Sequence, residues 1–315
     1  MSNNPLNGKA VEVVTLGEAM VLFWPRAGES LAEAAMYERS FGGAESNAAI
    51  ALARLGHTPR WISRLGADPF GRYIRASLQR EGARVDAPAD PHAPTAVFFK
   101  EQAAHGPRRV FYYRRGSAAS RLEPDDLSPA QFAGARLLHL TGITPALSPS
   151  CAAAVDHAIA LARAAGLLVC VDPNVRLQLW PSDDACRDTL RGLMARADLV
   201  LLGHEDAATL FPGLDEGAVI GAVRALGPRT VVLKLGERGA RGATDSEDVQ
   251  VEPYPVAVAD SVGAGDGFDA GFMAGLLRGL PLAGCLALGA RVGTAAVTVA
   301  GDWEGYPTAR EIDAD

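Results

Sequence analysis

The residues best suited to catalysis lie in a glycine-rich stretch at residues 260–268, directly before a long apolar run. Gly263, Ala264 and Gly265 carry little or no side chain, so their backbone N–H groups can approach a bound anion closely. A helix that begins here would also direct the positive end of its dipole at that anion. Asp266 stands at the mouth of this anion site, where its carboxylate would repel a phosphate group. That placement makes sense if Asp266 takes a proton from a hydroxyl group that attacks a phosphoryl group.

Two common phosphate-binding motifs do not fit this stretch. A dinucleotide-binding fingerprint requires a third glycine where Phe268 stands, and a P-loop requires a terminal Gly-Lys-Ser or Gly-Lys-Thr that is absent. A glycine-rich turn with only a structural role would need neither the Gly-x-Gly spacing nor the acidic residue. The stretch therefore favours an anion site that carries its own general base.

A second candidate site lies near the N-terminus, where Gly42 and Gly43 precede a run of small residues that we expect to be helical over residues 48–55. Gly43 would let the backbone approach a ligand, and the Asn47 amide can both donate to and accept from a sugar hydroxyl. Alone, this pattern is more typical of a glycine turn before an ordinary helix. Together with a phosphoryl-transfer site, it predicts a sugar-binding site.

Tyrosines and arginines are concentrated in the second of two strands that we expect at residues 95–101 and 109–115, joined by a Gly-Pro turn. Neighbouring residues of a strand point to opposite faces, so one tyrosine and one arginine, such as Tyr112 and Arg114, can face a ligand. Such a pair would suit a carboxylate. An amphipathic edge strand without a ligand is an equally good interpretation of these residues alone.

Polar residues also follow two apolar runs that we interpret as strands, at residues 167–172 and 230–235; the first is typical of a strand buried in a parallel sheet. Functional residues gather at the carboxyl ends of such strands. Asn174 and Arg176 follow the first run, and a guanidinium matches a carboxylate better than an ammonium does. The alternative for Arg176 is an ion pair with a neighbouring aspartate. Lys234 lies near the end of the second run, where it either assists ligand binding or reaches solvent.

The stretch at residues 260–266 resembles the C-terminal signature of the PfkB, or ribokinase-like, carbohydrate kinases, in which Asp-Thr-x-Gly-Ala-Gly-Asp opens a helix; here Ser261 replaces the threonine. Further motifs occur in the family's order from about residue 11 to residue 307. The resemblance implies an α/β fold over residues 10–310, a ribokinase-like three-layer αβα sandwich with a mainly parallel sheet. It also implies a small, discontinuous β-sheet lid from about residues 14–40 and 93–120, with the active site between lid and sandwich.

The same resemblance implies roles for the candidate residues. Asp266 would be the base of an ATP- and Mg²⁺-dependent phosphoryl transfer, with no metal ligand assigned. A helix expected over residues 283–299 would bring Gly289 and Gly293 past the adenine. Contacts to the developing phosphoryl charge are implied for Gly263, Ala264 and Gly265; substrate contacts for Gly43, Asn47, Tyr112, Arg114, Arg176 and Asp302; and nucleotide contacts for Asn174, Lys234, Gly236, Gly239, Gly263 and Gly265.

The run Tyr-Tyr-Arg-x-Gly-Ser-Ala-x-Ser at residues 112–120 resembles the 2-keto-3-deoxygluconate kinases within this family. It implies phosphorylation of the terminal hydroxyl of that sugar acid, giving the 6-phosphate. Two departures weaken the match: Phe98 stands where a lid tyrosine can occur, and Gly203 and Asp206 replace the ends of an Asn-x-x-Glu motif associated with magnesium-bound phosphates. A fructokinase or another neutral-sugar kinase is therefore one alternative, and a non-catalytic sugar or nucleotide sensor is another.

Composition excludes several other classes of protein. The 315 residues are 48% hydrophobic with a net charge of −7, so the excess of Lys and Arg that nucleic-acid binding requires is missing. The four cysteines lack the spacing of a disulfide framework or zinc site, and no apolar run reaches the ~18 residues of a membrane span. We expect a cytoplasmic enzyme that binds a small sugar acid and ATP and forms homo-oligomers through its lid. A requirement for a monovalent cation such as K⁺ near Asp260 and Ser261 stays open.

Overall fold

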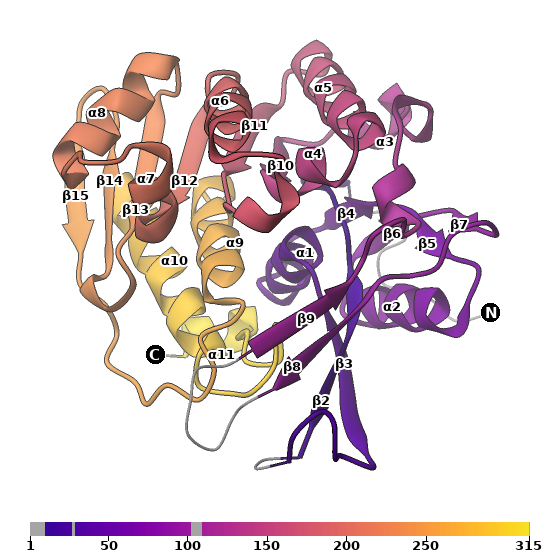
Figure 1. Ribbon diagram of the computed structural model, residues 1–315. Coiled ribbons are helices and arrows are strands. Elements are labelled where there is room, and N and C mark those ends of the chain that lie inside the picture. Colours follow the sequence, from indigo (N-terminus) through magenta and orange to yellow (C-terminus); the bar gives the residue numbers. More distant parts are fainter. Residues whose placement is uncertain (1–9, 27–28, 102–108, 315) are drawn as a thin grey trace.

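The computed structural model describes residues 10–26, 29–101 and 109–314. A nine-stranded sheet forms its centre (Figure 1), and from one edge to the other its strands are β15 (Asp248–Val251), β14 (Ala240–Ala243), β13 (Thr230–Lys234), β12 (Leu199–Gly203), β11 (Leu168–Asp172), β10 (Leu137–Thr141), β1 (Val13–Leu16), β4 (Pro59–Ile62) and β6 (Arg84–Asp86). Neighbouring strands from β6 to β13 are parallel, whereas β14 and β15 are antiparallel. The carboxyl ends of the parallel strands therefore meet along one edge of the sheet.

Helices cover both faces of the sheet because its strands send apolar side chains into two cores. Neighbours along β1 illustrate this division: Val13 packs into one core and Val14 into the other. The first core contains residues of α1 (Ala44–Arg54), α2 (Pro69–Arg80), α9 (Ala264–Leu277), α10 (Leu282–Ala296) and α11 (Ala309–Asp313). The second is covered by α3 (Pro129–Phe132), α4 (Ile143–Leu147), α5 (Pro149–Ala164), α6 (Asp183–Met194), α7 (His204–Leu210) and α8 (Glu216–Leu226). The predicted three-layer αβα sandwich is thus confirmed.

A second, smaller sheet stands apart from the sandwich and corresponds to the expected lid (Figure 1). Its strands are, in spatial order, β3 (Tyr37–Gly42), β2 (Met20–Pro25), β8 (Val97–Glu101) and β9 (Arg109–Tyr113). Residues 14–16 of the predicted lid range lie instead in β1 of the large sheet. The Gly-Pro turn expected between β8 and β9 lies outside the described residues. Shorter elements are β5 (Leu65–Gly66), β7 (Ala89–Asp90), and the 3₁₀ helices η1 (Ala119–Arg121), η2 (Pro124–Asp126), η3 (Leu177–Leu179) and η4 (Gly236–Arg238).

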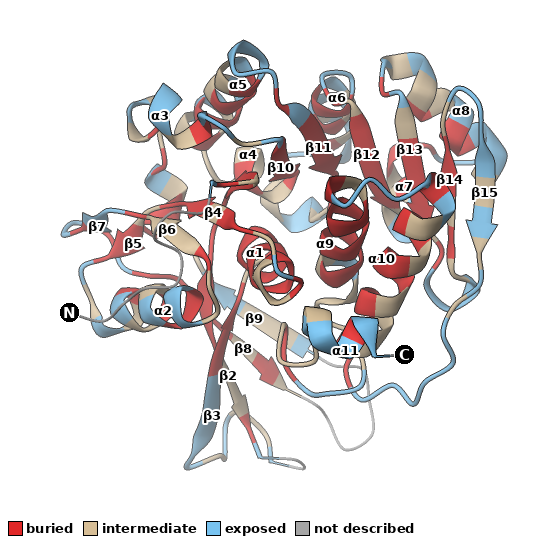
Figure 2. Cartoon of the chain, turned by 180° about the vertical axis from the view of Figure 1, so that it is seen from behind, coloured by how far each residue is buried: buried red, intermediate tan, exposed pale blue. Residues whose placement is uncertain are grey.

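Glycines determine how helix α9 is placed in the molecule. This helix is buried along nearly all of its length (Figure 2), and it packs closely against α10. A Cβ atom on Gly293 would lie 2.8 Å from the carbonyl oxygen of Ala264, and one on Gly289 would lie 3.0 Å from that of Phe268. The two glycines of α10 therefore permit close helix–helix contact, and their passage beside an adenine stays a prediction.

Two further expectations concern the state of the cysteines and the absence of a membrane-spanning segment. All four cysteines are buried free thiols, as expected for small core residues. Within the described residues, no helix is both long and apolar enough to span a membrane.

Candidate active site

The glycine-rich stretch forms a tight turn that opens directly into α9. Gly263 precedes the helix with a left-handed backbone, φ 78°. A Cβ atom there would lie 1.8 Å from the carbonyl oxygen of Asp302, and the Tyr306 hydroxyl donates a 2.8 Å hydrogen bond to the Gly263 carbonyl. Only glycine fits this position. Gly265 is exposed, which leaves the first turn of α9 open to an anion.

Asp266 lies in this first turn and is half-buried. The Asn47 side chain of α1 donates a hydrogen bond from Nδ2 to Asp266 Oδ2 across 2.8 Å. Burial raises the pKa of Asp266 to about 7, and the negative charge of Asp172 adds to the rise. The Asn47 hydrogen bond and the positive charges of Lys234 and Arg176 oppose it. A carboxyl group with a pKa near 7 is suited to accept a proton at neutral pH.

The predicted sugar-site glycine marks a close approach of two backbones. Helix α1 begins at Ala44, four residues before the predicted start, with Gly43 as its N-terminal cap. A Cβ atom on Gly43 would lie 2.1 Å from the carbonyl oxygen of Glu18, so no other residue fits. The Gly43 N–H also donates to Asn47 Oδ1 across 3.4 Å. The Asn47 amide therefore links the predicted sugar site to the predicted base.

Lys234 lies directly beneath the anion turn. Its Nζ is 3.0 Å from Asp172 Oδ2 and 2.9 Å from Asp269 Oδ1, and a Cβ atom on Gly265 would lie 3.7 Å from it. Burial disfavours the charged form of Lys234, but the two carboxylates outweigh burial and raise its pKa. Contrary to the solvent-facing alternative, the ammonium is buried between carboxylates. A phosphate group at Gly265 would lie close to this positive charge.

Asn174 and Asp206 bring oxygen atoms to the same edge of the sheet. Asn174 has a left-handed backbone, φ 38°, and its side-chain Oδ1 is buried without a hydrogen-bond partner among the residues that the structure describes. Strained backbone and an unpaired buried acceptor are features that a functional site can explain. Asp206 accepts a 3.1 Å hydrogen bond from the backbone N–H of Val175. Burial raises the pKa of Asp206 to about 7, and the charge of Asp172 contributes.

The guanidinium of Arg176 faces the same region. Its positive charge lowers the pKa of Asp266, of Asp206 and of the lid residue Tyr112, against the effect of burial. It donates a 2.8 Å hydrogen bond to the carbonyl of its neighbour Val175. In the part of the chain that the structure describes, it forms no ion pair with a carboxylate. Arg176 thus keeps its charge for a ligand.

The two lid residues predicted to bind a carboxylate differ in their surroundings. Tyr112 is 40% exposed and stacks on Phe98, with ring centroids 5.7 Å apart. Arg114, in contrast, forms an ion pair with the buried carboxylate of Glu18, to which its Nε and NH2 lie 2.7 and 2.6 Å away. Ser117 also donates to Glu18. The charge of Arg114 is therefore already balanced within the protein, whereas Tyr112 is accessible.

Asp302 is also paired within the protein. Its carboxylate is buried and forms an ion pair with Lys100 of the lid. A Cβ atom on Gly42 would lie 2.0 Å from Asp302 Oδ2, so Gly42 allows the carboxylate to approach the lid strand β3. The structure thus brings Asp302 to the floor of the predicted sugar site, next to Gly42, with its charge balanced by Lys100.

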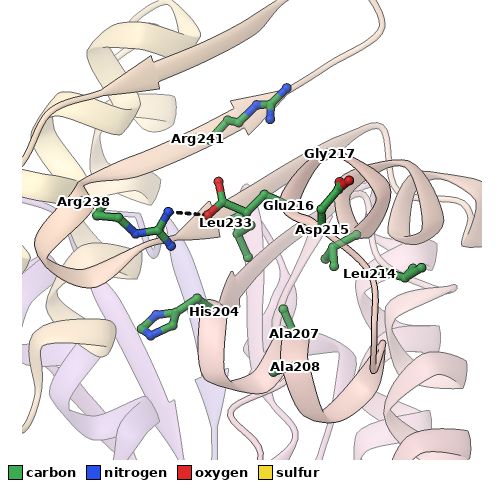
Figure 3. Close-up of a pocket in the computed structure, with 11 residues that line it drawn as sticks. His204, Ala207, Ala208, Leu214, Asp215, Glu216, Gly217, Leu233, Arg238 and Arg241 are labelled. Carbon is green, nitrogen blue, oxygen red and sulfur yellow. Dashed lines mark hydrogen bonds and ion pairs between the residues drawn. The ribbon is translucent and has the colours of Figure 1, made fainter.

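The predicted nucleotide loop follows β13 and includes η4. Gly236 and Gly239 both have left-handed backbones, φ 61° and 81°. A Cβ atom on Gly239 would lie 2.0 Å from the carbonyl oxygen of Val251, so close backbone packing already explains why glycine stands here. A cavity of about 590 Å³ lies beside this loop, between α7 and α8, and the Arg238–Glu216 ion pair crosses it (Figure 3). Asp266 does not line it, so this cavity is separate from the predicted base.

Sequence reasoning missed four charged residues of the site: Glu18, Glu45, Lys100 and Asp269. Glu45 is buried and accepts hydrogen bonds from Thr141 and Thr144 at 2.6 and 2.8 Å. It lies inside the Gly-Gly motif that the sequence did single out, and Asp269 lies one helical turn beyond Asp266. These two could have been noticed as acidic residues in otherwise apolar stretches. The partners of Glu18 and Lys100 are distant in sequence, so no local pattern indicates them.

Comparison with known proteins settles the family. The model of the pfkB family carbohydrate kinases matches residues 11–309. The chain belongs to the pfkB family of carbohydrate kinases. A 2-dehydro-3-deoxygluconokinase of Bacillus subtilis (strain 168) is 34% identical, covering 96% of this chain and 94% of the relative. Fructokinase-2 of Oryza sativa subsp. japonica is 33% identical, covering 81% of this chain and 77% of the relative.

Solved structures agree with this pfkB assignment. A PfkB protein from Polaromonas sp. JS666 is 37% identical with a TM-score of 0.89, covering 97% of this chain and 100% of the other. A fructokinase double mutant from Vibrio cholerae O395, with fructose, ADP and potassium ion bound, is 25% identical with a TM-score of 0.85, covering 98% and 99%. The alternative of a sensor without catalysis loses its support, because the family model and the relatives compared are all carbohydrate kinases.

The site of this pfkB kinase suits Mg²⁺ that is held largely by the nucleotide. Within the described residues, no group of three or more His, Cys, Asp or Glu side chains could hold a metal by itself. Mg²⁺ usually keeps several waters and binds one or two carboxylates together with substrate phosphates. Asp206 and Asn174 Oδ1 are the oxygen atoms at this edge of the sheet that would be available to such an ion.

Proposed function

We propose that this pfkB kinase transfers the γ-phosphoryl group of ATP to the terminal hydroxyl of 2-keto-3-deoxygluconate, giving the 6-phosphate. The observation that carries the proposal is the position of Asp266. Its carboxylate lies in the first turn of α9, beside the anion turn, and its pKa of about 7 is raised by burial. A base and an anion site are therefore adjacent, as phosphoryl transfer to a hydroxyl requires.

In the proposed reaction, the hydroxyl oxygen forms a bond to the γ-phosphorus while the bond from that phosphorus to the β,γ-bridging oxygen breaks. Asp266 accepts the hydroxyl proton, and ADP leaves with the bridging oxygen. Asn47 orients the Asp266 carboxylate through its 2.8 Å hydrogen bond. Orientation by α1 keeps the base in one geometry before the substrate arrives.

The negative charge of the transferred group would be stabilised by the anion turn. The backbone N–H groups of residues 263–265 and the positive end of the α9 dipole would be directed at the transferred phosphoryl group. Lys234 adds a buried positive charge beneath Gly265. Mg²⁺, when bound with the nucleotide near Asn174 and Asp206, would neutralise phosphate charge. We place the nucleotide along the loop that contains Gly236 and Gly239.

The acid group of the substrate would be recognised chiefly by Arg176. This guanidinium has no carboxylate partner among the described residues and acts electrostatically on both Asp266 and Tyr112. Tyr112 is exposed on the facing lid strand and can add a hydrogen bond. Arg114 would contribute through Glu18, by fixing the lid. The identity of 34% to the Bacillus 2-dehydro-3-deoxygluconokinase supports the same substrate class.

A fructokinase is the second candidate, because specific observations favour it. Two of the lid contacts expected for an acid are reduced, since Arg114 is neutralised by Glu18 and Phe98 has no hydroxyl group. A rice fructokinase is nearly as similar in sequence as the Bacillus enzyme. A neutral sugar would use Asn47, Asp302 and the Gly43 backbone without requiring Arg176.

The function is tested by measuring ADP release with Mg-ATP and four sugars in parallel: 2-keto-3-deoxygluconate, its galactonate epimer, fructose and ribose. We expect a kcat/KM for the two keto-deoxy acids that exceeds that for the neutral sugars by about tenfold or more, a difference of 1.4 kcal/mol. Turnover of fructose or ribose alone would support the kinase activity but would contradict the proposed recognition of an acidic substrate. Absence of ADP release with all four would reject the proposed substrates.

We also propose that two copies associate through the outer face of the lid. This face carries an aromatic cluster made of Phe23, Tyr37, Phe99 and Tyr113, with centroids of neighbouring rings 5.5 to 6.1 Å apart. Tyr113 is 66% exposed and Tyr37 is 40% exposed, so the cluster presents a contiguous apolar patch of the kind that marks interfaces. Sedimentation of the wild type and of Tyr113→Glu should show a dimer that the substitution weakens; a monomeric wild type would reject the proposal.

A further inference from the structure

Lys100 places a positive charge between two buried carboxylates behind the anion turn. It lies on lid strand β8, and only 8% of its side chain is exposed. Its Nζ forms an ion pair with Asp302 and lies 3.9 Å from Asp260 Oδ2. The carboxylates of Asp302 and Asp260 are 7% and 4% exposed. Buried carboxylates are stable only when a positive charge or hydrogen bonds compensate them.

The two carboxylates belong to the segments that shape the anion turn. Asp260 accepts hydrogen bonds from the backbone N–H groups of Val262 and Gly301 at 3.0 and 3.4 Å. Asp302 presents its backbone carbonyl to Gly263, where a Cβ atom would lie only 1.8 Å away. The charge balance at Asp260 and Asp302 therefore bears on the geometry of the turn that would bind phosphate.

A bound monovalent cation near Asp260 does not fit these surroundings. Such a cation would meet the ammonium of Lys100, which already pairs with Asp302 and lies within 3.9 Å of Asp260. Two positive charges that share one pair of carboxylates repel each other. The potassium ion of the Vibrio cholerae fructokinase structure thus has no obvious counterpart in this chain.

We propose that the ammonium of Lys100 is a built-in counter-ion that replaces a bound monovalent cation in this kinase. Because Lys100 belongs to the lid, its ion pair also attaches β8 to the segment that holds Asp302. The Phe98 ring lies 5.8 Å from the same ammonium and adds a weaker attraction. The inference rests on the kinase activity of the family and does not depend on which sugar is phosphorylated.

The surroundings of Lys100 make the proposal testable by substitution. A cavity of about 410 Å³ is lined by Lys100 and Asp260, together with Trp24, Glu38 and Gly301. Arg26 also lines this cavity, and a small cation from solvent can reach Asp260 through it once the ammonium is removed. Lys100→Met keeps the length of the apolar stem and deletes the charge. Arg109→Met removes a lid cation that is 65% exposed and serves as the matched control.

The experiment compares KCl with tetramethylammonium chloride at equal ionic strength. Thermal unfolding is followed without substrates, and ADP release is followed with the best substrate of the wild type. We expect wild type and Arg109→Met to be insensitive to the exchange, with turnover altered less than about twofold. Lys100→Met should melt at a lower temperature and lose turnover, and KCl, but not tetramethylammonium, should restore part of both.

Several results would overturn the proposal. One is a wild type that loses tenfold or more of its turnover, or melts at a lower temperature, when K⁺ is withdrawn. Another is a folded Lys100→Met that responds to K⁺ no more than Arg109→Met does. If Lys100→Met does not fold, the wild-type measurement alone decides. Since melting requires no sugar, failure of the proposed substrate would be distinguishable from failure of this inference.

Discussion

The lid and the strand-end floor of the active site use their positive charges differently. Among the described residues, two cations of the lid are neutralised by carboxylates that lie outside the strands of the lid sheet: Lys100 by Asp302, and Arg114 by Glu18. On the floor, Arg176 follows β11 and keeps its charge without a carboxylate partner among the described residues. The difference indicates that the charged residues of the lid hold the lid in place, whereas the positive charge available to an acidic substrate is that of Arg176 at the strand ends.

The largest expected effect concerns the base on the floor. Asp266→Asn removes the group that accepts the proton but keeps its size, and we expect kcat to fall by about a thousandfold. ATP affinity, measured by equilibrium binding, should change little, because Asp266 is proposed to accept the hydroxyl proton and not to contact the nucleotide. A variant with near-wild-type turnover would show that another group is the base.

A lid substitution should act mainly on stability. Arg114→Met leaves the Glu18 carboxylate buried without its counter-ion, and we expect the free energy of unfolding to fall by about 3–5 kcal/mol. The double variant Glu18→Gln/Arg114→Met should lose less. Burial raises the pKa of Glu18, so the single variant can take up a proton, and its loss should shrink as the pH falls. Urea unfolding at several pH values measures this; equal losses in single and double variants would contradict the role assigned to the pair.

The anion turn can be compared with a glycine elsewhere in the chain. Gly263 and Gly279 have similar backbones, φ 78° and 74°, but only the first has a neighbour in the way of a Cβ atom. Gly279→Ala should cost only the ~1–2 kcal/mol of the left-handed conformation. Gly263→Ala should cost more and also lower turnover, because the turn must move away from Asp302. Equal unfolding energies with unchanged turnover would mean that the turn tolerates a side chain.

The smallest expected effect is a shift in pH dependence. The pKa of Asp266 is raised to about 7, so the carboxyl is protonated below that pH and kcat/KM should rise as the pH increases through 7. The Asn47 hydrogen bond lowers this pKa, so Asn47→Leu should move the rise to higher pH. Asp206 also has a pKa of about 7, and Asp206→Asn serves as the control that should keep the rise. A profile that is flat from pH 5 to 8 would exclude Asp266 as the titrating base.

The sandwich and the anion turn could be predicted from the sequence because their determinants are local. Apolar runs of strand length and the Gly-x-Gly-Asp spacing lie within a few residues of one another. The pairs that join elements distant in the sequence could not be predicted this way. Asn47 and Asp266 are 219 residues apart, and Lys100 and Asp302 are 202 apart, so only the folded topology brings them together.

Lys234 illustrates a further limit of sequence reasoning. The sequence predicts its position near the end of a strand and leaves solvent or a ligand as its surroundings. Its actual partners come from β11 and α9, 62 and 35 residues away, and hold it in a buried cluster. Charge pairing between elements depends on side-chain packing, which spacing along one strand does not contain.

The division of labour between floor and lid is tested most directly by the ratio of kcat/KM for 2-keto-3-deoxygluconate to that for fructose. Arg176→Met should lower this ratio by about thirtyfold or more, because an acid that loses its charged hydrogen-bond partner forfeits at least ~2 kcal/mol. Arg114→Met, measured where it is folded, should change the ratio much less. An unchanged ratio in Arg176→Met, or a larger fall in Arg114→Met, would contradict the account.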